Sequence, residues 1–311
     1  MANSMFHRIA GFFRGEVSPP AIYLTAFGKH PGWDDHIGDL GDSTPLLAAF
    51  KNRLYDQGIS SQIDSGKWER LQPSQQVEGF DHQIVLIGGS DVIVGHIWSS
   101  RDGKGRSRYP LVGCAQCHGI SPERAIREVL PRIDAFGPTI LELATAREVR
   151  DAVNQLRAEL SAIAAEPAAA APLGGQTPTG ISRRGQMALV YHLDRELGIC
   201  QSGAATSPGG SAQLRVPTVA GGEPSILAWL GFLSGILPGS VPILAMAPRG
   251  RDWIDLIAGP LSPPHFYCLR VNRLVIPNTT DIPYEMDADF IERAGRLIDS
   301  AAAKSATAVK E

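Results

Sequence analysis

Residues 83–98 read QIVLIGGSDVIVGHIW, two apolar runs separated by a short polar turn. The runs Gln83–Ile87 and Val92–Trp98 are rich in β-branched residues, and the intervening GGSD (88–91) has the composition of a tight hairpin turn. A third apolar run, Tyr109–Cys117, follows after a polar loop. The stretch therefore predicts a three-stranded antiparallel meander at the centre of the fold.

Further elements flank this meander. Upstream, Ala21–Phe27 predicts a strand, and a helix is expected to begin at Ser43 or Thr44, which can cap it, and to end at Gly58. Downstream, Ser121-Pro122-Glu123 predicts the start of one helix, and Pro138 the start of a long helix that runs to about Ala164. In the last third of the chain, the sequence predicts strands at 186–192, 241–247 and 266–271 and helices at 224–236 and 287–298.

This order of elements predicts an α/β fold of the α+β kind, with helices packed on a central antiparallel or mixed sheet. The arrangement is compatible with a longin-like sheet. An Ala-, Pro- and Gly-rich stretch predicts a linker at 166–182. We therefore expect an N-terminal extension (1–19), an N-terminal domain (20–165), that linker, a smaller C-terminal α/β lobe (183–299) and a disordered tail (300–311).

The composition excludes several classes of protein. The 311 residues are 43% hydrophobic and 20% charged, which suits a packed core and not a disordered chain. The net charge of -3 provides no basic field for nucleic acid. We find neither a signal-peptide core nor an apolar run of the roughly 18 residues that a membrane span needs. With only four cysteines, we expect a reduced cytoplasmic protein without membrane insertion or a cofactor.

The loop after the first predicted strand concentrates polar groups. Its sequence FGKHPGWDDHIGD (27–39) includes His30, Asp34, Asp35, His36 and Asp39, residue types that ligate divalent metal ions. No second cluster and no H-E-x-x-H spacing supports such a site. The other interpretation is structural, with glycines in turns, an aspartate capping backbone amides and Trp33 packed beneath. The sequence leaves both interpretations open.

A second polar loop, SSRDGKGRSRYP (99–110), carries four cations between two predicted strands. Arg101, Lys104, Arg106 and Arg108 could bind an anion together with the glycine amides, because guanidinium groups and free amides are good donors. The loop could equally be a solvated hairpin tip or pair with the acidic loop at 27–39. It lacks the G-x-x-x-x-G-K-[ST] spacing of a Walker A loop.

Two further patterns bear on catalysis. Cys114-Ala-Gln-Cys117-His118 matches the C-x-x-C-H string of haem attachment, but it ends an apolar strand, where we expect buried thiols. The chain contains no G-x-S-x-G elbow and no dinucleotide-binding fingerprint. We therefore assign no catalytic residue and expect a protein that is not an enzyme.

Taken together, the two polar loops resemble motifs of the TagF/ImpM family, which is associated with bacterial type VI secretion. FGKHPGWDD (27–35) is similar to the opening F-G-K-x-P-x-x-G-D-F of that family. WSSRDGKGRSRYPL (98–111) is similar to its S-x-D-x-x-G-R-x-[FY]-P-L signature, with one extra residue before the tyrosine. The resemblance covers roughly residues 20–135. It departs at Gly32–His36, where the family has R-G-D.

The resemblance implies a divergent, non-enzymatic accessory protein that controls the assembly of a type VI-like secretion system after translation. Its partner would be a forkhead-associated scaffold or another component of that system. We expect a partner- or anion-binding site, with no metal, formed by Lys29, Trp33, Asp34, Asp35, Arg101, Asp102, Arg106 and Arg108. All of these except Trp33 and Arg101 are predicted to meet at one edge of the sheet. The alternative is a metal-dependent hydrolase that uses His30, Asp34, Asp35 and His36 within 30–39.

Overall fold

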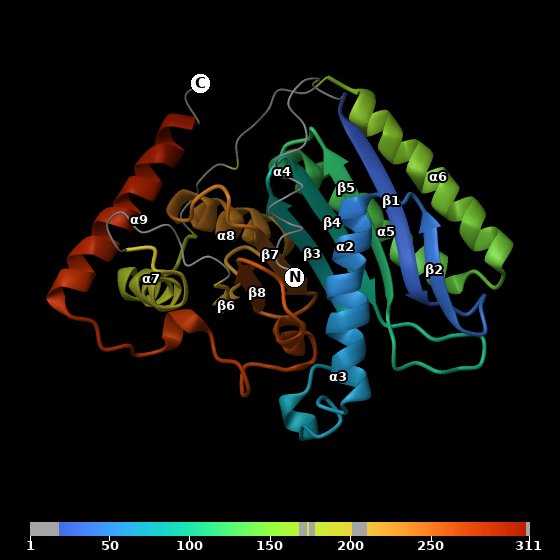
Figure 1. Ribbon diagram of the computed structural model, residues 1–311, viewed down its shortest axis with the longest axis horizontal. Helices are drawn as coiled ribbons and strands as arrows, with labels where there is room; N and C mark the ends of the chain where they lie inside the picture. The colour runs from blue at the N-terminus through green and yellow to red at the C-terminus, as the bar shows by residue number, and fades with distance from the viewer. Residues whose placement is uncertain (1–18, 168–172, 174–177, 201–209, 309–311) are drawn as a thin grey trace.

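The computed structural model describes residues 19–167, 173, 178–200 and 210–308 (Figure 1). Within these residues, one eight-stranded antiparallel sheet has the order β2-β1-β5-β4-β3-β7-β8-β6. The strands are β1 (Ala21–Lys29), β2 (His36–Gly41), β3 (Asp81–Gly88), β4 (Asp91–Trp98), β5 (Leu111–His118), β6 (Ala212–Pro217), β7 (Ile243–Pro248) and β8 (Trp253–Ala258). The predicted α+β fold is confirmed, and the sheet is antiparallel rather than mixed.

The predicted meander forms the middle of this sheet. Strands β3 and β4 pair from Asp81↔Trp98 to Gly88↔Asp91, so the turn falls where the sequence places it. Strand β5 then pairs with β4, and β1 with β5. On the other side, β7 pairs with β3, so the strands of residues 183–299 continue the same sheet. The described residues form no second sheet.

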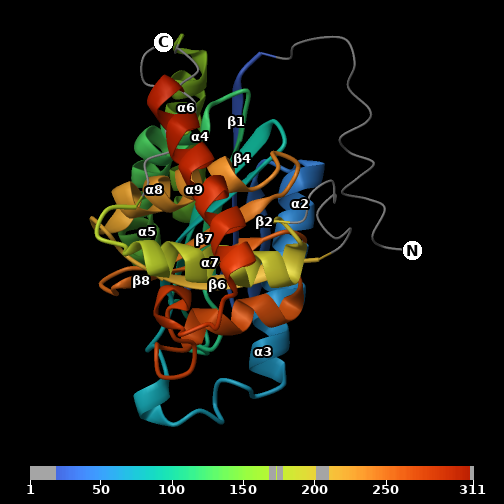
Figure 2. The same ribbon diagram turned by 90° about the vertical axis from the view of Figure 1, so that its left-hand side faces the viewer.

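Helices cover the two faces of the sheet (Figures 1 and 2). One core lies between the sheet and α5 (Leu130–Glu142), α6 (Ala146–Ala165), α7 (Arg183–Leu197), α8 (Gly222–Ile236) and α9 (Ala288–Ala308). The other lies between the opposite face and α2 (Pro45–Lys51), the π-helical segment Asn52–Ile59, α3 (Ser60–Asp64) and the 3₁₀ helix Pro263–Arg270. The shorter elements are α4 (Pro122–Arg124), the π-helical segment Ala125–Val129 and the 3₁₀ turns Pro73–Gln75 and Thr279–Asp281. No helix of the described part of the chain has the length and apolar character needed to cross a bilayer.

Two helix boundaries differ from the prediction. Gly58 does not end the first helix, since the chain stays helical to Asp64. The glycine instead packs against the Phe266 ring, where there is no room for a side chain. Pro138 does not begin a helix but lies within α5. The next helix starts after Thr145, whose hydroxyl accepts a hydrogen bond from the Glu148 amide (3.2 Å). This capping box is a helix start signal that the sequence contains and that was not used in the prediction.

The C-terminal part holds most of the other corrections. Residues 186–192, predicted as a strand, lie in helix α7, where Leu189, Leu193 and Leu197 are buried at helical spacing. Residues 266–271 lie mostly in a 3₁₀ helix. Strands β2, β6 and β8 were not predicted. Helix α9 continues past residue 299 and buries Ala301, so the tail does not begin there. Of the predicted linker, 168–172 and 174–177 lie outside the described residues, as does nearly all of the predicted extension.

A close contact between α5 and β4 gives the first testable prediction. A Cβ atom on Gly137 would lie 2.1 Å from Cε2 of the Trp98 indole. Gly137→Ala should therefore force α5 away from the sheet and lower the free energy of unfolding by about 1–3 kcal/mol, the usual cost of overpacking. Denaturant unfolding measures this effect.

The matched control is Gly295→Ala in helix α9. Its nearest new neighbour would be the Arg183 guanidinium at 3.6 Å, an ordinary contact. The same substitution there should leave stability unchanged or raise it by up to about 1 kcal/mol, because alanine favours helix more than glycine does. Equal effects at the two positions would contradict the packing described here.

Candidate binding site

The two motif-bearing loops, far apart in sequence, lie side by side at one end of β1 and β5. We call residues 29–35 and 99–110 together the paired-loop surface. The backbone amide of Gly103 donates to the Trp33 carbonyl (2.7 Å), and the Lys29 amide donates to the Pro110 carbonyl (3.0 Å). The Ser100 hydroxyl donates to the Lys29 carbonyl (2.7 Å). The two loops are therefore joined by hydrogen bonds between uncharged groups, in addition to their ion pairs.

Gly103 makes the close approach of the two loops possible. A Cβ atom at this position would lie 2.9 Å from Oδ1 of Asp34 and 3.1 Å from the carbonyl oxygen of Pro31. Any side chain would push the loops apart and break the bond to Trp33. The glycine of the Arg101-Asp102-Gly103 sequence is thus required by packing.

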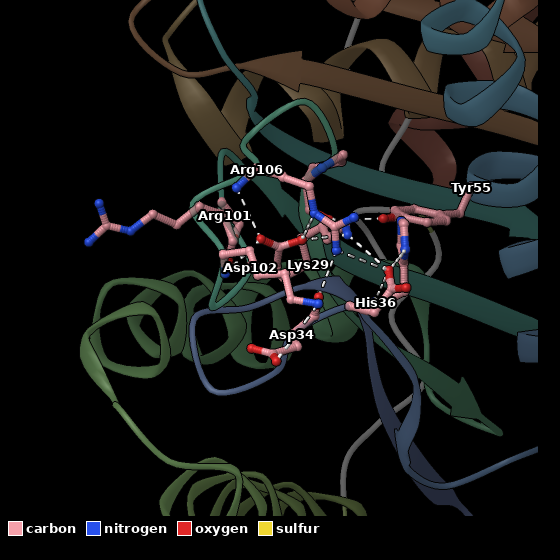
Figure 3. Close-up of polar contacts among 11 residues, drawn as sticks. Lys29, Asp34, His36, Tyr55, Arg101, Asp102 and Arg106 are labelled. Atoms are coloured by element: carbon pink, nitrogen blue, oxygen red, sulfur yellow. Dashed lines mark hydrogen bonds and ion pairs between the residues drawn. The ribbon is translucent and has the colours of Figure 1, made fainter.

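Asp102 is the centre of the paired-loop surface (Figure 3). Its side chain is fully buried. Its Oδ1 accepts hydrogen bonds from the backbone amides of Lys104 and Arg106, each at 3.0 Å. Its Oδ2 accepts from Nζ of Lys29 and Nε of Arg106, each at 2.7 Å. The amides and cations that could have bound an external anion therefore bind the chain's own carboxylate. Burial alone would raise the pKa of Asp102, but the bonds from Lys29 and Arg106 outweigh it and hold the pKa well below its usual range.

Lys29 connects the two loops electrostatically. It is the last residue of β1 and only 3% exposed, yet its ammonium has two acidic partners: Asp102 and, at 3.0 Å, Asp35. Asp35 is 75% exposed, and hydrogen bonds from Lys29 and then His36 lower the pKa of its carboxyl. The buried side of the surface is thus charge-balanced, and the ionised Asp35 carboxylate reaches solvent.

The other predicted residues surround this centre without entering it. Asp34 accepts a bond at its carbonyl from Arg106 (2.6 Å), and its exposed carboxylate lies 3.9 Å from the Lys104 ammonium. Trp33 packs with its ring beneath the Arg150 guanidinium (5.7 Å). The Arg101 side chain points away from the cluster, and within the described residues it has no hydrogen bond or ion pair (Figure 3).

Arg108, predicted to meet the other charged residues at one edge of the sheet, pairs outside the cluster around Asp102. Its guanidinium pairs with Glu69 and donates to the Ile63 carbonyl (3.1 Å). The neighbouring Tyr109 hydroxyl donates to Asp64 (2.6 Å). Both contacts fasten the loop to the region around the end of α3, and neither was predicted from the sequence. Glu69 and Asp64 stand about 40 positions before their partners, and no local pattern marks such a pairing.

The residues of the alternative metal site are engaged in other contacts. His30 is fully buried, accepts a bond from the Gly32 amide at Nδ1 (2.9 Å) and therefore donates from Nε2 to the Ile140 carbonyl (2.7 Å). Burial lowers the pKa of His30, so the ring is neutral and both nitrogens are engaged. His36 binds Asp35 through Nδ1. Over the described ranges, no group of three or more His, Cys, Asp or Glu residues is placed to hold a metal ion.

The C-x-x-C-H string also forms no joint site. Cys114 and Cys117 lie in the two different hydrophobic cores, on opposite faces of the sheet. Burial raises the pKa of each thiol to about 12, so neither is a ready nucleophile. His118 binds Asp91 instead (2.7 Å). The expectation of buried strand thiols is confirmed.

No protein-family model matches the chain, and no curated protein matches it significantly.

Proposed function

We propose that this protein is a non-enzymatic accessory protein of a type VI-like secretion system and binds a protein partner through the paired-loop surface. The partner that we propose is a forkhead-associated scaffold. By binding this scaffold, the protein would control assembly of the secretion system after translation. The observation that carries the proposal is the Lys29–Asp102 ion pair. It joins residues 73 positions apart, one from each of the two motifs that resemble the TagF/ImpM family.

The distribution of charge supports a contact role. The buried groups of the surface neutralise one another, whereas the groups at its rim remain accessible: the side chains of Lys104 and Arg106 are 61% and 54% exposed. Arg101 adds an exposed cation without a partner among the described residues. Rigid loops with exposed arginines and mixed charge suit recognition of another protein, where rim charges guide association.

The same geometry gives catalysis little support. A general acid or base works best with a pKa near the working pH. The carboxyl pKa values of Asp35 and Asp102 are held low, so both groups are ionised at neutral pH and already engaged with cations. We therefore favour binding over turnover at this site.

Reversing two exposed cations tests the proposal. If Arg101 and Lys104 meet acidic groups of the partner, Arg101→Glu combined with Lys104→Glu should weaken binding to a purified forkhead-associated scaffold from the same genome by about tenfold or more, because like charges would then face each other. Both side chains are exposed, so the fold should survive. Isothermal titration calorimetry gives the affinity, and a circular dichroism spectrum checks the fold.

Arg293→Glu is the matched control. Arg293 is an exposed residue of helix α9, at the far end of the molecule from β1 and β2 (Figure 1). This variant should bind as the unaltered protein does. Equal loss in both variants would indicate a general charge effect, and wild-type affinity in the double variant would contradict the proposed surface.

A further inference from the structure

A second polar cluster, separate from the paired-loop surface, surrounds His96 of strand β4. The His96 ring is fully buried, and both of its nitrogens meet carboxylates. Nδ1 lies 2.7 Å from Oδ1 of Asp134 on helix α5, and Nε2 lies 2.7 Å from Oδ1 of Asp81 at the start of β3. The ring also stacks on the Trp98 indole, with centroids 4.7 Å apart and planes at 6°.

The two carboxylates are ionised at neutral pH. Burial alone would raise the pKa of Asp134, but hydrogen bonds from His96 and Gln83, and the pairing with Arg249, hold it below the ordinary value. Its Oδ2 is 2.5 Å from the Gln83 amide nitrogen and 2.7 Å from the Arg249 guanidinium. At Asp81, burial is likewise outweighed by His96, and the pKa is lowered.

Ionised carboxylate oxygens only accept hydrogen bonds, so each ring nitrogen of His96 must donate one. A neutral ring would leave one nitrogen lone pair against a carboxylate oxygen at hydrogen-bonding distance. We infer that His96 is a doubly protonated imidazolium at neutral pH and acts as an ionic latch that fastens helix α5 to strands β3 and β4. Loss of one ring proton to solvent, as the pH rises, opens the latch.

Other titratable and charged groups face the same cluster. His82, on β3, has a pKa lowered to about 3, by burial first and then by the charge of His96, so it stays neutral. Glu223 of α8 has a pKa raised by burial and by Asp134, and Arg127 opposes this shift. Arg249, from the turn after β7, supplies the remaining cation. The latch thus joins groups on strands β3 and β4 with Arg249, which follows strand β7. This inference does not depend on the proposed function.

Helix α5 gives the latch a structural consequence at a distance. The Ile140 carbonyl near the end of α5 holds the His30 ring, which in turn holds the Gly32 amide within the paired-loop surface. Asp134 anchors the same helix nearer its start. Opening the latch should therefore loosen the helix on which the first loop rests.

Nitrogen-15 NMR of histidine-labelled protein measures the charge state directly. At pH 7, both ring nitrogens of His96 should carry protons, because each faces a carboxylate oxygen. Where the second proton has been removed, the opening equilibrium of α5, from amide hydrogen-exchange protection factors, should rise roughly ten- to a hundredfold, the effect of losing one charge-assisted hydrogen bond.

Two variants complete the test. Asp81→Asn removes a charge from a carboxylate that is 57% exposed, so the protein should still fold, and His96 should lose its second proton at a lower pH. Asp91→Asn is the matched control. It removes the charge of the carboxylate that meets the His118 ring, and it should leave both ring protons of His96 in place. A non-protonated His96 nitrogen at pH 7 in the unaltered protein, or no response to Asp81→Asn, would overturn the inference.

Discussion

Replacing Asp102 by alanine should open the loop at 99–110 and abolish partner binding. The substitution removes the acceptor of four hydrogen bonds and leaves the Lys29 ammonium buried with Asp35 as its remaining acidic partner. A buried cation that loses its main partner is strongly destabilising, because its desolvation is no longer offset. The two loops would then lose the ion pair that joins them.

Trypsin measures this opening, because the loop holds Arg101, Lys104, Arg106 and Arg108 as cleavage sites. In the Asp102→Ala variant, cleavage at these sites should be at least about tenfold faster, since local unfolding governs proteolysis of a folded protein. Asp34→Ala is the control: its carboxylate is 77% exposed and makes one ion pair at 3.9 Å, so cleavage should not change. Unchanged cleavage in Asp102→Ala would show that the Asp102 bonds do not hold the loop.

The pH dependence of this ion pair follows from the depressed pKa of Asp102. A carboxyl group whose folded-state pKa lies below its unfolded value contributes its stability above the unfolded value, about 3.9. That stability is lost as the pH falls through the folded pKa. The loop should therefore stay closed from neutral pH to well below pH 5.

The largest effect on global stability is expected for Asp255→Ala. Arg215 on β6 and Asp255 on β8 face each other as cross-strand partners, with side chains 0% and 1% exposed. The pair is bidentate, with both nitrogen–oxygen distances at 2.8 Å, and the guanidinium also donates to the Ile276 and Cys268 carbonyls. Removing Asp255 leaves the buried Arg215 cation without its carboxylate partner. This should lower the free energy of unfolding by about 3–5 kcal/mol.

Two comparisons show whether the pairing causes that loss. Asp252→Ala removes a 66% exposed carboxylate that pairs with Arg273, and it should cost less than about 1 kcal/mol. The double replacement Arg215→Met, Asp255→Leu removes both charges and should recover most of the stability lost in Asp255→Ala, because no unpaired charge remains. Denaturant unfolding of all three variants measures the effects. A double variant no more stable than Asp255→Ala would contradict the explanation.

The sequence predicted the strands best where hydrophobic pattern and turn chemistry agreed. At 83–98, β-branched runs flank a glycine turn, and the hairpin forms there in that register. Edge strand β2 was missed because Gly38, Asp39 and Gly41 are exposed and give no alternating apolar pattern. The run at 186–192 was read as a strand because its apolar residues cluster. Its capping residue Ser182 and the spacing of Leu189, Leu193 and Leu197 indicate the helix that forms.

For the site, the sequence identified the loops but not the distribution of contacts within them. Lys29, Asp35, Asp102 and Arg106 converge as expected, because their loops leave β1 and enter β5, which are neighbours in the sheet. Arg108 pairs with Glu69 instead. This pairing depends on the position of the chain after α3 in space, which the sequence does not show. The sequence does not show that the Asp102 carboxylate is buried and occupies the donors that could have bound an external anion, because this depends on the geometry of the loop.

A hydrogen–deuterium exchange footprint tests the central claim most directly. Exchange would be compared for the protein alone and in complex with a forkhead-associated scaffold from the same genome. Our account predicts slower exchange of the backbone amides at 30–35 and 99–110, with no matching change on helix α9. Stable complex formation with protection confined to other elements, or no complex at micromolar concentrations, would contradict it.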